Sequence, residues 1–170
     1  MRRGVRLGVD VGSVRVGLAA SDPDGMLASA VTTLARDPAG DLDLHRVVAE
    51  AAERGALEVV VGLPLSLSGR EGPAAELARG YAGRLARLLP ATPVRLVDER
   101  LSTVAATQQL HGAGVRGRRH RSVVDQVAAV VVLQGALDAE RASGRPPGSL
   151  VDPGPVAEGP SPSAQEASPG

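Results

Sequence analysis

The stretch that decides the fold is V-R-L-G-V-D-V, Val5 to Val11, which is followed after Gly12-Ser13 by V-R-V-G-L-A-A, Val14 to Ala20. Both runs are rich in β-branched residues and a short glycine turn separates them, a pattern that predicts a β-hairpin. Asp22-Pro23-Asp24-Gly25 is a strong turn signal, and the segment from Leu27 to Leu34 predicts a third strand. The first part of the chain is therefore expected to form a three-stranded antiparallel meander.

Helices and strands alternate after the meander. Apolar spacing and end signals predict helices over 41–55, 73–88, 102–110 and 122–142, with short buried strands over 58–62 and 94–98. Short connections between helices and strands favour parallel pairing with right-handed crossovers. The predicted fold class is α/β, with a five-stranded mixed sheet, made of the antiparallel meander plus parallel strands, flanked by helices.

Length and composition limit the possible functions. A chain of 170 residues suits one domain, which we expect over residues 1–142, and the Gly, Pro and Ser-rich segment 143–170 predicts a disordered tail. Tyr81 is the only aromatic residue, so base stacking on aromatic platforms is excluded as a main binding mode. The absence of cysteine excludes disulfides, thiolate zinc sites and a cysteine nucleophile. No apolar stretch is long enough to span a membrane, so we expect a cytoplasmic protein.

Charge is balanced over the chain as a whole. The 19 basic residues are all arginine and the formal net charge is zero. The protein is therefore not a polycation, and any binding to nucleic acid has to come from a local basic patch.

The first candidate ligand for a metal ion is Asp10, inside the first strand. Strand alternation places it on the same face as Gly8 and Gly12. Glycines on both sides should leave room around this carboxylate, where a structural residue would be packed. The alternative is an ordinary aspartate in solvent at an edge strand or turn.

Glu99 is the second candidate. It follows the strand V-R-L-V-D, at the end of the strand where ligands gather in open α/β sheets. Alternation places its neighbour Asp98 on the opposite face, so the two acids should not serve one site. The alternative is a pair of loop charges, with Asp98 bound to Arg100.

The third candidate, Asp125, ends the pattern S-V-V-D, which also fits a capping box that begins at Ser122. Helical spacing nevertheless places Asp125 in a row with Ala128, Ala129 and Val132, a small apolar face that suits packing against the sheet. A carboxylate on such a face is costly without a cation.

Together, Asp10, Glu99 and Asp125 predict a magnesium or manganese site. Magnesium prefers hard oxygen ligands and also binds the phosphate oxygens of its substrates. Two such ions, ~3.5–4 Å apart, would activate water and stabilise the leaving oxygen of a phosphodiester. We therefore expect two ions and a phosphodiester-hydrolysing enzyme.

Candidate substrate-binding residues lie near these carboxylates in the sequence. The run R-G-R-R-H-R, Arg116 to Arg121, predicts a flexible basic loop that contacts a nucleic-acid backbone, and the alternative is a disordered, solvated loop. Arg15 follows a glycine turn that a phosphate could approach, and two serines follow the strand over 58–62. The expected substrate contacts are Arg15, Ser66, Ser68, Arg100, Arg118, Arg119 and Arg121.

Four ordered blocks resemble the YqgF family, also called RuvX or Holliday-junction-resolvase-like proteins. They are R-L-G-V-D-V-G-S-V-R-V-G-L-A-A-S-D, V-V-V-G-L-P-L-S-L-S-G, V-D-E-R-L-S-T and V-V-D-Q-V-A-A-V-V-V-L-Q. The resemblance implies an RNase H-like fold and a nuclease that matures the 5′ end of pre-16S ribosomal RNA, with Asp10, Glu99 and Asp125 as its acidic site. The chain departs from the family pattern at Ser66 and Ser68, where Asn and Asp are common.

Other functions stay open at this stage. The same chemistry could act on branched DNA, for which a symmetric homodimer is expected, whereas an RNA nuclease could be a monomer. A non-catalytic nucleic-acid-binding factor could keep the fold. D-x-G-x-x-x-x-G on the first hairpin also resembles the phosphate loop of sugar kinases and actin, but those proteins need a second domain that this chain lacks.

Overall fold

The computed structural model describes residues 1–101 and 118–154, with the backbone alone for Leu101, residues 118–123 and Asp125. The strands of the described part are β1 (Arg6–Val11), β2 (Arg15–Ser21), β3 (Ala28–Ala35), β4 (Glu58–Leu63), β5 (Val94–Asp98) and β6 (Ser149–Leu150). Its helices are α1 (Leu42–Glu53), α2 (Pro73–Leu88), the short 3-10 helix η1 (Glu99–Leu101) and α4 (Arg118–Ser143). The helix expected over 102–110 lies outside the described residues.

The strands form one mixed sheet in the order β3-β2-β1-β4-β5-β6. The meander β1-β2-β3 is antiparallel, and β4 and β5 add to it in parallel, as the sequence predicts. The predicted strand count is corrected from five to six, because β6 pairs antiparallel with β5 through Arg95–Leu150 and Leu96–Ser149. A strand of two residues is too short to show alternation in the sequence.

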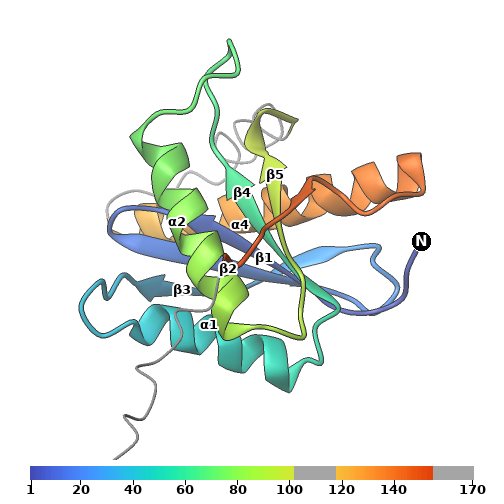
Figure 1. Cartoon of the computed structure of the whole chain (residues 1–170), viewed down its shortest axis with the longest axis horizontal. Coiled ribbons are helices and arrows are strands. Elements are labelled where there is room, and N and C mark those ends of the chain that lie inside the picture. The colour runs from blue at the N-terminus through green and yellow to red at the C-terminus, as the bar shows by residue number, and fades with distance from the viewer. Residues whose placement is uncertain (102–117, 155–170) are drawn as a thin grey trace, which may run out of the picture.

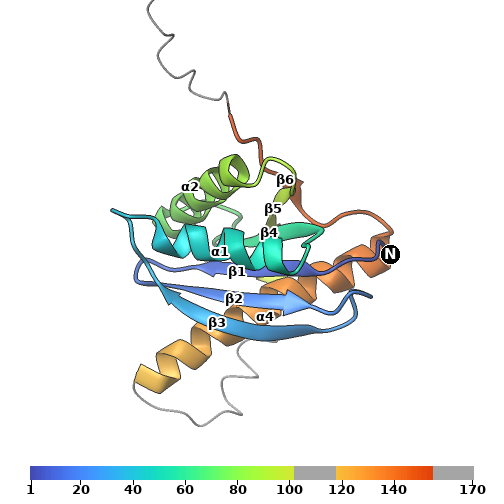
Figure 2. The same cartoon turned by 90° about the horizontal axis from the view of Figure 1, so that it is seen from below.

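Helices cover both faces of the sheet (Figures 1 and 2). Figure 2 shows α1 and α2 on one face and α4 on the other. Strand alternation supplies both cores: Val59 and Val61 of β4 belong to the α1 and α2 side, whereas Val60 packs with Ala129 and Leu133 of α4. Among the described helices, none is long and apolar enough to cross a membrane.

Helix α4 packs very closely on β1. A Cβ atom at Gly8 would lie 2.6 Å from the Cβ of Leu133 and 3.0 Å from the carbonyl oxygen of Ala129. The sequence led us to expect that Gly8 leaves open space beside Asp10, and this expectation is wrong. Gly8 instead allows the helix backbone to approach the strand.

Buried ion pairs fix the C-terminal end of α4 to the beginning of β1. Nη2 of Arg6 lies 3.3 Å from Oε2 of Glu140, and Nε of Arg2 lies 2.9 Å from Oε1 of the same residue. The side chains of Arg6 and Glu140 are 1% and 3% exposed, so loss of one partner would leave an unpaired buried charge. This cluster sets the position of α4 along β1.

The segment after α4 crosses the outer edge of the sheet. We call residues 147–154 the strap. Gly148 has a φ of 62°, and a Cβ there would overlap the carbonyl group of Leu96. Beyond β6, Val151 donates its N–H to the carbonyl oxygen of Val94 at 2.8 Å and packs on the core. The expectation of a disordered tail is therefore wrong for these residues, while residues 155–170 lie outside the described part.

Candidate active site

Two acidic side chains from different elements meet on the α4 face of the sheet. Asp10 lies in β1, and Glu99 opens η1 directly after β5. The pKa of Glu99 is raised to about 8, mainly by burial, and also by a hydrogen bond with the carboxyl group of Asp10 and by the negative charges of Asp10 and Asp98. Two carboxyl groups form such a bond when they share a proton, which is the usual result of bringing like charges together.

Gly62 of β4 makes this meeting possible. Val9 pairs with Val61, so Asp10 lies beside Gly62 at one edge of β4. At the other edge Gly62 pairs with Val97, and Glu99, two residues later, follows on the same face of the sheet as Val97. A Cβ at Gly62 would overlap Oε1 of Glu99 and lie 3.0 Å from its Cγ. Glu99 therefore reaches Asp10 only because β4 has no side chain at this position.

Sequence reasoning did not assign a role to Gly62, although a signal was present. The strand E-V-V-V-G-L is fully buried, and its glycine directly follows three β-branched valines. An isolated glycine inside such a strand indicates close approach of another group.

Asp98 points away from this pair and forms an ion pair with Arg100. Nη2 and Nε of Arg100 lie 2.5 and 2.9 Å from Oδ2 of Asp98. The hydrogen bond from Arg100 lowers the pKa of Asp98. The guanidinium of Arg100, a predicted substrate contact, is therefore bound to a carboxylate at the rim of the site.

Asp125 lies on α4, two turns after the first described residue of that helix, Arg118. Ser122 is inside the helix, so it is not an N-cap, and the capping-box interpretation of Asp125 is wrong. The side chain of Asp125 lies outside the description. Among the side chains described, no group of three His, Cys, Asp or Glu residues could hold a metal ion.

The expected basic loop is partly helical. Arg118, Arg119 and Arg121 belong to the first turns of α4, and Arg116 falls outside the described residues. The backbone in this region continues the helix that carries Asp125, so these arginines are placed by the same element as the third carboxylate. Arg15 begins β2, where its carbonyl oxygen accepts the N–H of Gly12 at 2.8 Å.

Ser66 and Ser68 lie in a hairpin between β4 and α2, which projects from the end of the sheet (Figure 1). We call residues 65–71 the β4–α2 hairpin. Its two serine hydroxyls are 2.9 Å apart and hydrogen-bond to each other. Arg100 approaches the hairpin, since a Cβ at Gly69 would lie 3.4 Å from Nη1 of Arg100. The two serines and Arg100 are thus close to the side of the sheet that carries Glu99.

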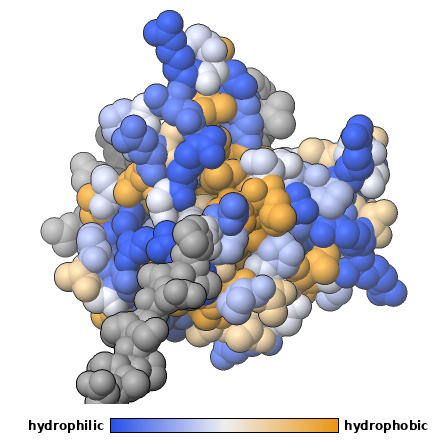
Figure 3. All heavy atoms as spheres, viewed as in Figure 1, coloured by the Kyte–Doolittle hydropathy of each residue, from blue (hydrophilic) through white to orange (hydrophobic). Residues whose placement is uncertain are grey.

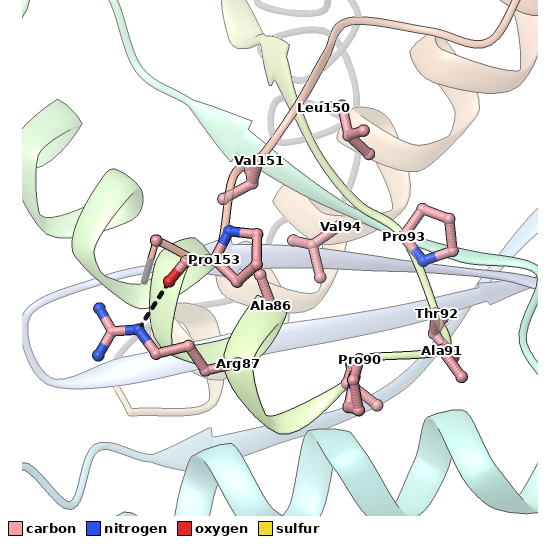
Figure 4. A pocket seen from close by; sticks show the side chains of 12 residues that line it. Ala86, Arg87, Pro90, Ala91, Thr92, Pro93, Val94, Leu150, Val151 and Pro153 are labelled. Carbon is pink, nitrogen blue, oxygen red and sulfur yellow. Dashed lines mark hydrogen bonds between the residues drawn. The ribbon is translucent and has the colours of Figure 1, made fainter. Parts of the chain in front are cut away.

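A pocket of about 600 Å3 lies at the other end of β5, between the C-terminal end of α2 and the strap (Figure 4). Its walls are mostly apolar and include Leu89, Val94 and Val151. Nε of Arg87 donates a hydrogen bond of 3.1 Å to the carbonyl oxygen of Pro153 at its rim. Val94 begins β5 and Glu99 follows its end, so the pocket is separate from the acidic pair.

Comparisons with known proteins agree on one family. The RuvX family, described as Holliday junction resolvase, matches residues 4–139. A protein of Kineococcus radiotolerans named "Putative pre-16S rRNA nuclease" is 62% identical over 151 residues, covering 89% of this chain and 80% of the relative. Proteins with the same name from Thermobifida fusca and Streptomyces coelicolor are 56% and 54% identical, each match covering 89% of this chain and 98% and 90% of the relative.

A solved structure shares the architecture. The structure of T. thermophilus RuvC in complex with Holliday junction substrate has a TM-score of 0.55 and 14% identity, covering 84% of this chain and 99% of that chain. At this identity the similarity shows a common fold, a mixed α/β sheet flanked by helices of the RNase H-like kind. From the family match and the sequence identities, the chain belongs to the RuvX family.

Proposed function

We propose that this protein is a metal-dependent nuclease that matures the 5′ end of pre-16S ribosomal RNA. The observation that carries the proposal is the hydrogen-bonded pair of Asp10 and Glu99, in which burial and like charge raise the pKa of Glu99 to about 8. A carboxyl pair that has to share a proton when no cation is bound suits a divalent cation, which replaces that proton.

The donor set fits magnesium or manganese. Asp10 and Glu99 supply the hard carboxylate oxygens that these ions prefer, and the chain has no cysteine. Bound ions, which we expect to be two, would supply an activated water and stabilise the leaving oxygen. The protein's own part is to hold the carboxylates in place before substrate arrives: β1 fixes Asp10, and Gly62 allows Glu99 to cross β4.

The packing of α4 supports Asp125 as the third ligand. Glu140 of α4 contacts Arg6 of β1, and Leu133 of α4 lies over Gly8 of β1. A step of two residues forward along β1 therefore corresponds to a step of seven residues backward along α4. One further step of the same size leads from Gly8 to Asp10 and from Leu133 to Gln126, the neighbour of Asp125. By this extrapolation we expect Asp125 on the part of α4 that faces Asp10.

The substrate assignment rests on the relatives and on charge. The curated relatives carry the name of a pre-16S rRNA nuclease, a function that would place the protein in the cytoplasm. With no Phe or Trp in the chain, phosphate contacts from arginine must provide much of the affinity. We expect them from Arg15, Arg118, Arg119 and Arg121, with Ser66, Ser68 and Arg100 near the scissile bond.

Branched DNA is the second candidate substrate, because the matching family is described as Holliday junction resolvase. Cleavage of a four-way junction would require two active sites related by symmetry, and hence a homodimer. An RNA nuclease can act as a monomer. A protein that only binds nucleic acid, without cleaving it, would gain nothing from two buried acidic side chains in contact.

One experiment separates these functions. Purified protein is incubated with an RNA that contains the 5′ end of pre-16S rRNA, and separately with a four-way DNA junction, each with and without Mg2+ or Mn2+. The proposal predicts metal-dependent cleavage of the RNA, which Asp10→Asn abolishes. Cleavage of the junction alone would favour the resolvase, and binding without cleavage of either substrate would favour a non-catalytic factor.

A further inference from the structure

A single leucine at the tip of the β4–α2 hairpin is almost completely exposed. Leu67 has 98% of its surface accessible, more than any other large apolar residue among those described. Isolated apolar residues are common on protein surfaces, so exposure alone carries no inference. Leu67 differs from the others in the rigidity and the position of the backbone that holds it.

Hydrogen bonds close the hairpin on both sides of Leu67. Ser66 donates its N–H to the carbonyl oxygen of Arg70 at 3.0 Å, and Gly69 donates its own to the carbonyl oxygen of Ser66 at 2.8 Å. The Ser66 hydroxyl accepts the N–H of Arg70 at 3.0 Å. These bonds fix the turn without any contact to the leucine side chain. The turn is therefore ordered, at a cost in conformational entropy, while its apolar side chain stays in water.

The base of the hairpin is fixed as well. Leu65 and Glu71 form an isolated antiparallel bridge. The carboxylate of Glu71 forms an ion pair with Arg79 of α2, which ties the hairpin to that helix. Leu67 is therefore presented at a defined position relative to the sheet.

The hairpin that carries Leu67 begins beside the acidic pair. Leu63 at the end of β4 pairs with Asp98, so the hairpin leaves the sheet at the edge where Glu99 emerges from β5. Arg100, the next residue, lies against Gly69 in the hairpin. Figure 3 shows that the end of the molecule over the hairpin is largely hydrophilic, whereas apolar surface gathers in the middle of this face. A lone leucine in hydrophilic surroundings does not resemble a protein-binding patch.

We propose that Leu67 is a wedge that inserts between neighbouring bases of a base-paired nucleic acid and opens the helix next to the scissile phosphate. Aliphatic side chains such as leucine insert between base steps and unstack them in other nucleic-acid-binding proteins. A chain without Phe or Trp has no aromatic side chain for this task. Arg70 belongs to the hairpin and Nη1 of Arg100 lies against Gly69, so two arginines are available near the turn for the phosphates that flank an opened step.

The inference deepens the proposed function and rests on it. It assigns a preference for paired over unpaired substrate, which the metal site alone would not create. The carboxylates hold the cation and act on any phosphodiester, whereas Leu67 acts only where there is stacking to disrupt. Leu67 is thus a specificity residue that touches the bases and not the reacting atoms.

The absence of tryptophan from the chain provides a direct probe. A Leu67→Trp variant carries one indole, and the only tyrosine, Tyr81, is buried. The Asp10→Asn substitution is added to prevent cleavage, and an RNA hairpin, a DNA duplex and unpaired RNA are titrated in separate arms. We expect the indole emission to be quenched by paired nucleic acid as the bases stack on it. Leu42→Trp is the matched control, because Leu42 is 71% exposed on α1, on the far face of the sheet.

The outcomes separate the inference from the function on which it rests. If fluorescence anisotropy of labelled RNA shows binding but the Leu67→Trp emission changes no more than that of Leu42→Trp, the wedge is wrong and the nuclease proposal stands. If the wild-type chain neither binds nor cleaves nucleic acid, both are wrong. Quenching by the RNA hairpin but not by the DNA duplex would assign the wedge to RNA, and the reverse would assign it to DNA.

A cleavage assay gives a second readout. Leu67→Ala should lower kcat/KM on a base-paired substrate about tenfold, in line with the loss of a base-stacking contact, and leave cleavage of unpaired RNA unchanged. Leu67→Met, which keeps a flexible apolar side chain, should retain most of the activity on paired RNA. An equal loss on both substrates would contradict the wedge and indicate a general role of the hairpin.

Discussion

The carboxyl group of Glu99 crosses β4 to form a hydrogen bond with that of Asp10, and the pKa of Glu99 is raised to about 8 as a result of burial and of its acidic neighbour. Asp10 lies in β1 and Glu99 directly follows β5, and Gly62 of the strand between them, β4, provides the space. Two carboxylates this close together lower the stability of the fold unless they share a proton or bind a cation.

The raised pKa of Glu99 makes the stability of the metal-free protein depend on pH. The folded pKa of about 8 exceeds the ordinary value of 4.5, so the folded state holds the proton more tightly than the unfolded state. This contribution is complete below pH 4.5 and is lost as pH rises towards 8, by at most about 1.4 kcal/mol per pH unit. Urea unfolding between pH 5 and 8 should show this loss.

Glu99→Gln is the variant that checks the origin of this slope. It removes the titrating group, so its stability should change less between pH 5 and 8 and exceed that of the wild type at pH 8. Magnesium should reduce the slope of the wild type only. A slope that is the same in both proteins would assign the pH dependence to other groups.

Gly62→Ala should disturb the site and leave the fold in place. The added Cβ overlaps Oε1 of Glu99, a movable side chain, so we expect Glu99 to swing away from Asp10. Cleavage should fall at least about tenfold, since misplacement of a reacting group by an ångström has effects of this size or larger. Gly80→Ala on α2 is the matched control, because a Cβ at Gly80 meets nothing within 4 Å.

Full activity of Gly62→Ala would show that Glu99 does not have to cross β4. Circular dichroism and the melting temperature separate this outcome from misfolding. Gly80→Ala should keep wild-type activity and gain about 0.5–1 kcal/mol of stability from its higher helix propensity.

The strap should contribute to stability, in contrast to the segment after it. Gly148→Ala forces a left-handed φ on alanine and a clash with the carbonyl group of Leu96, so β6 should detach from β5. We expect a loss of about 1–2 kcal/mol from exposure of Val151 and the pocket wall. Removal of residues 155–170 should leave the melting temperature unchanged. Equal melting temperatures for Gly148→Ala and the wild type would contradict a packed strap.

The arginines at the beginning of α4 make a prediction about salt. Replacing Arg118, Arg119 and Arg121 with Ala should weaken RNA binding and flatten its dependence on salt, each lost phosphate contact reducing the slope by about 0.7–0.9. The measurement is fluorescence anisotropy at several salt concentrations. Arg46→Ala is a control, because Arg46 is exposed and pairs with Glu50 within α1, which covers the opposite face of the sheet from α4. An unchanged slope would mean that these arginines stay in solvent.

Local patterns predicted most of the fold. The meander, the two parallel strands and the helices α1 and α2 follow from alternation, apolar spacing and Pro73, and each begins within one or two residues of its predicted position. The strap was missed because a strand of two residues has no period and Pro and Gly around it resemble a linker. The beginning of α4 was placed too late, because Gly117 and the arginines after it suggested a loop.

The sequence indicated candidate residues for the site better than it indicated how they meet in space. Alternation correctly separated Asp98 from Glu99, and Asp98 is bound to Arg100 as the alternative interpretation held. The role of Gly62 depends on two neighbouring strands and could not follow from β4 alone. The assignment of Asp125 as a ligand stays a prediction.

Metal binding tests the central claim most directly. Thermal unfolding is followed with increasing Mg2+ or Mn2+ for the wild type, Asp10→Asn, Asp125→Asn and the control Asp98→Asn. We predict that metal raises the melting temperature of the wild type and of Asp98→Asn, because an ion that binds only the folded state stabilises it. Asp10→Asn and Asp125→Asn should fold, lose this increase and fail to cleave RNA in the same buffers. Retention of the metal-dependent increase by Asp10→Asn, or its loss in Asp98→Asn, would contradict a cation site built on Asp10 and Glu99.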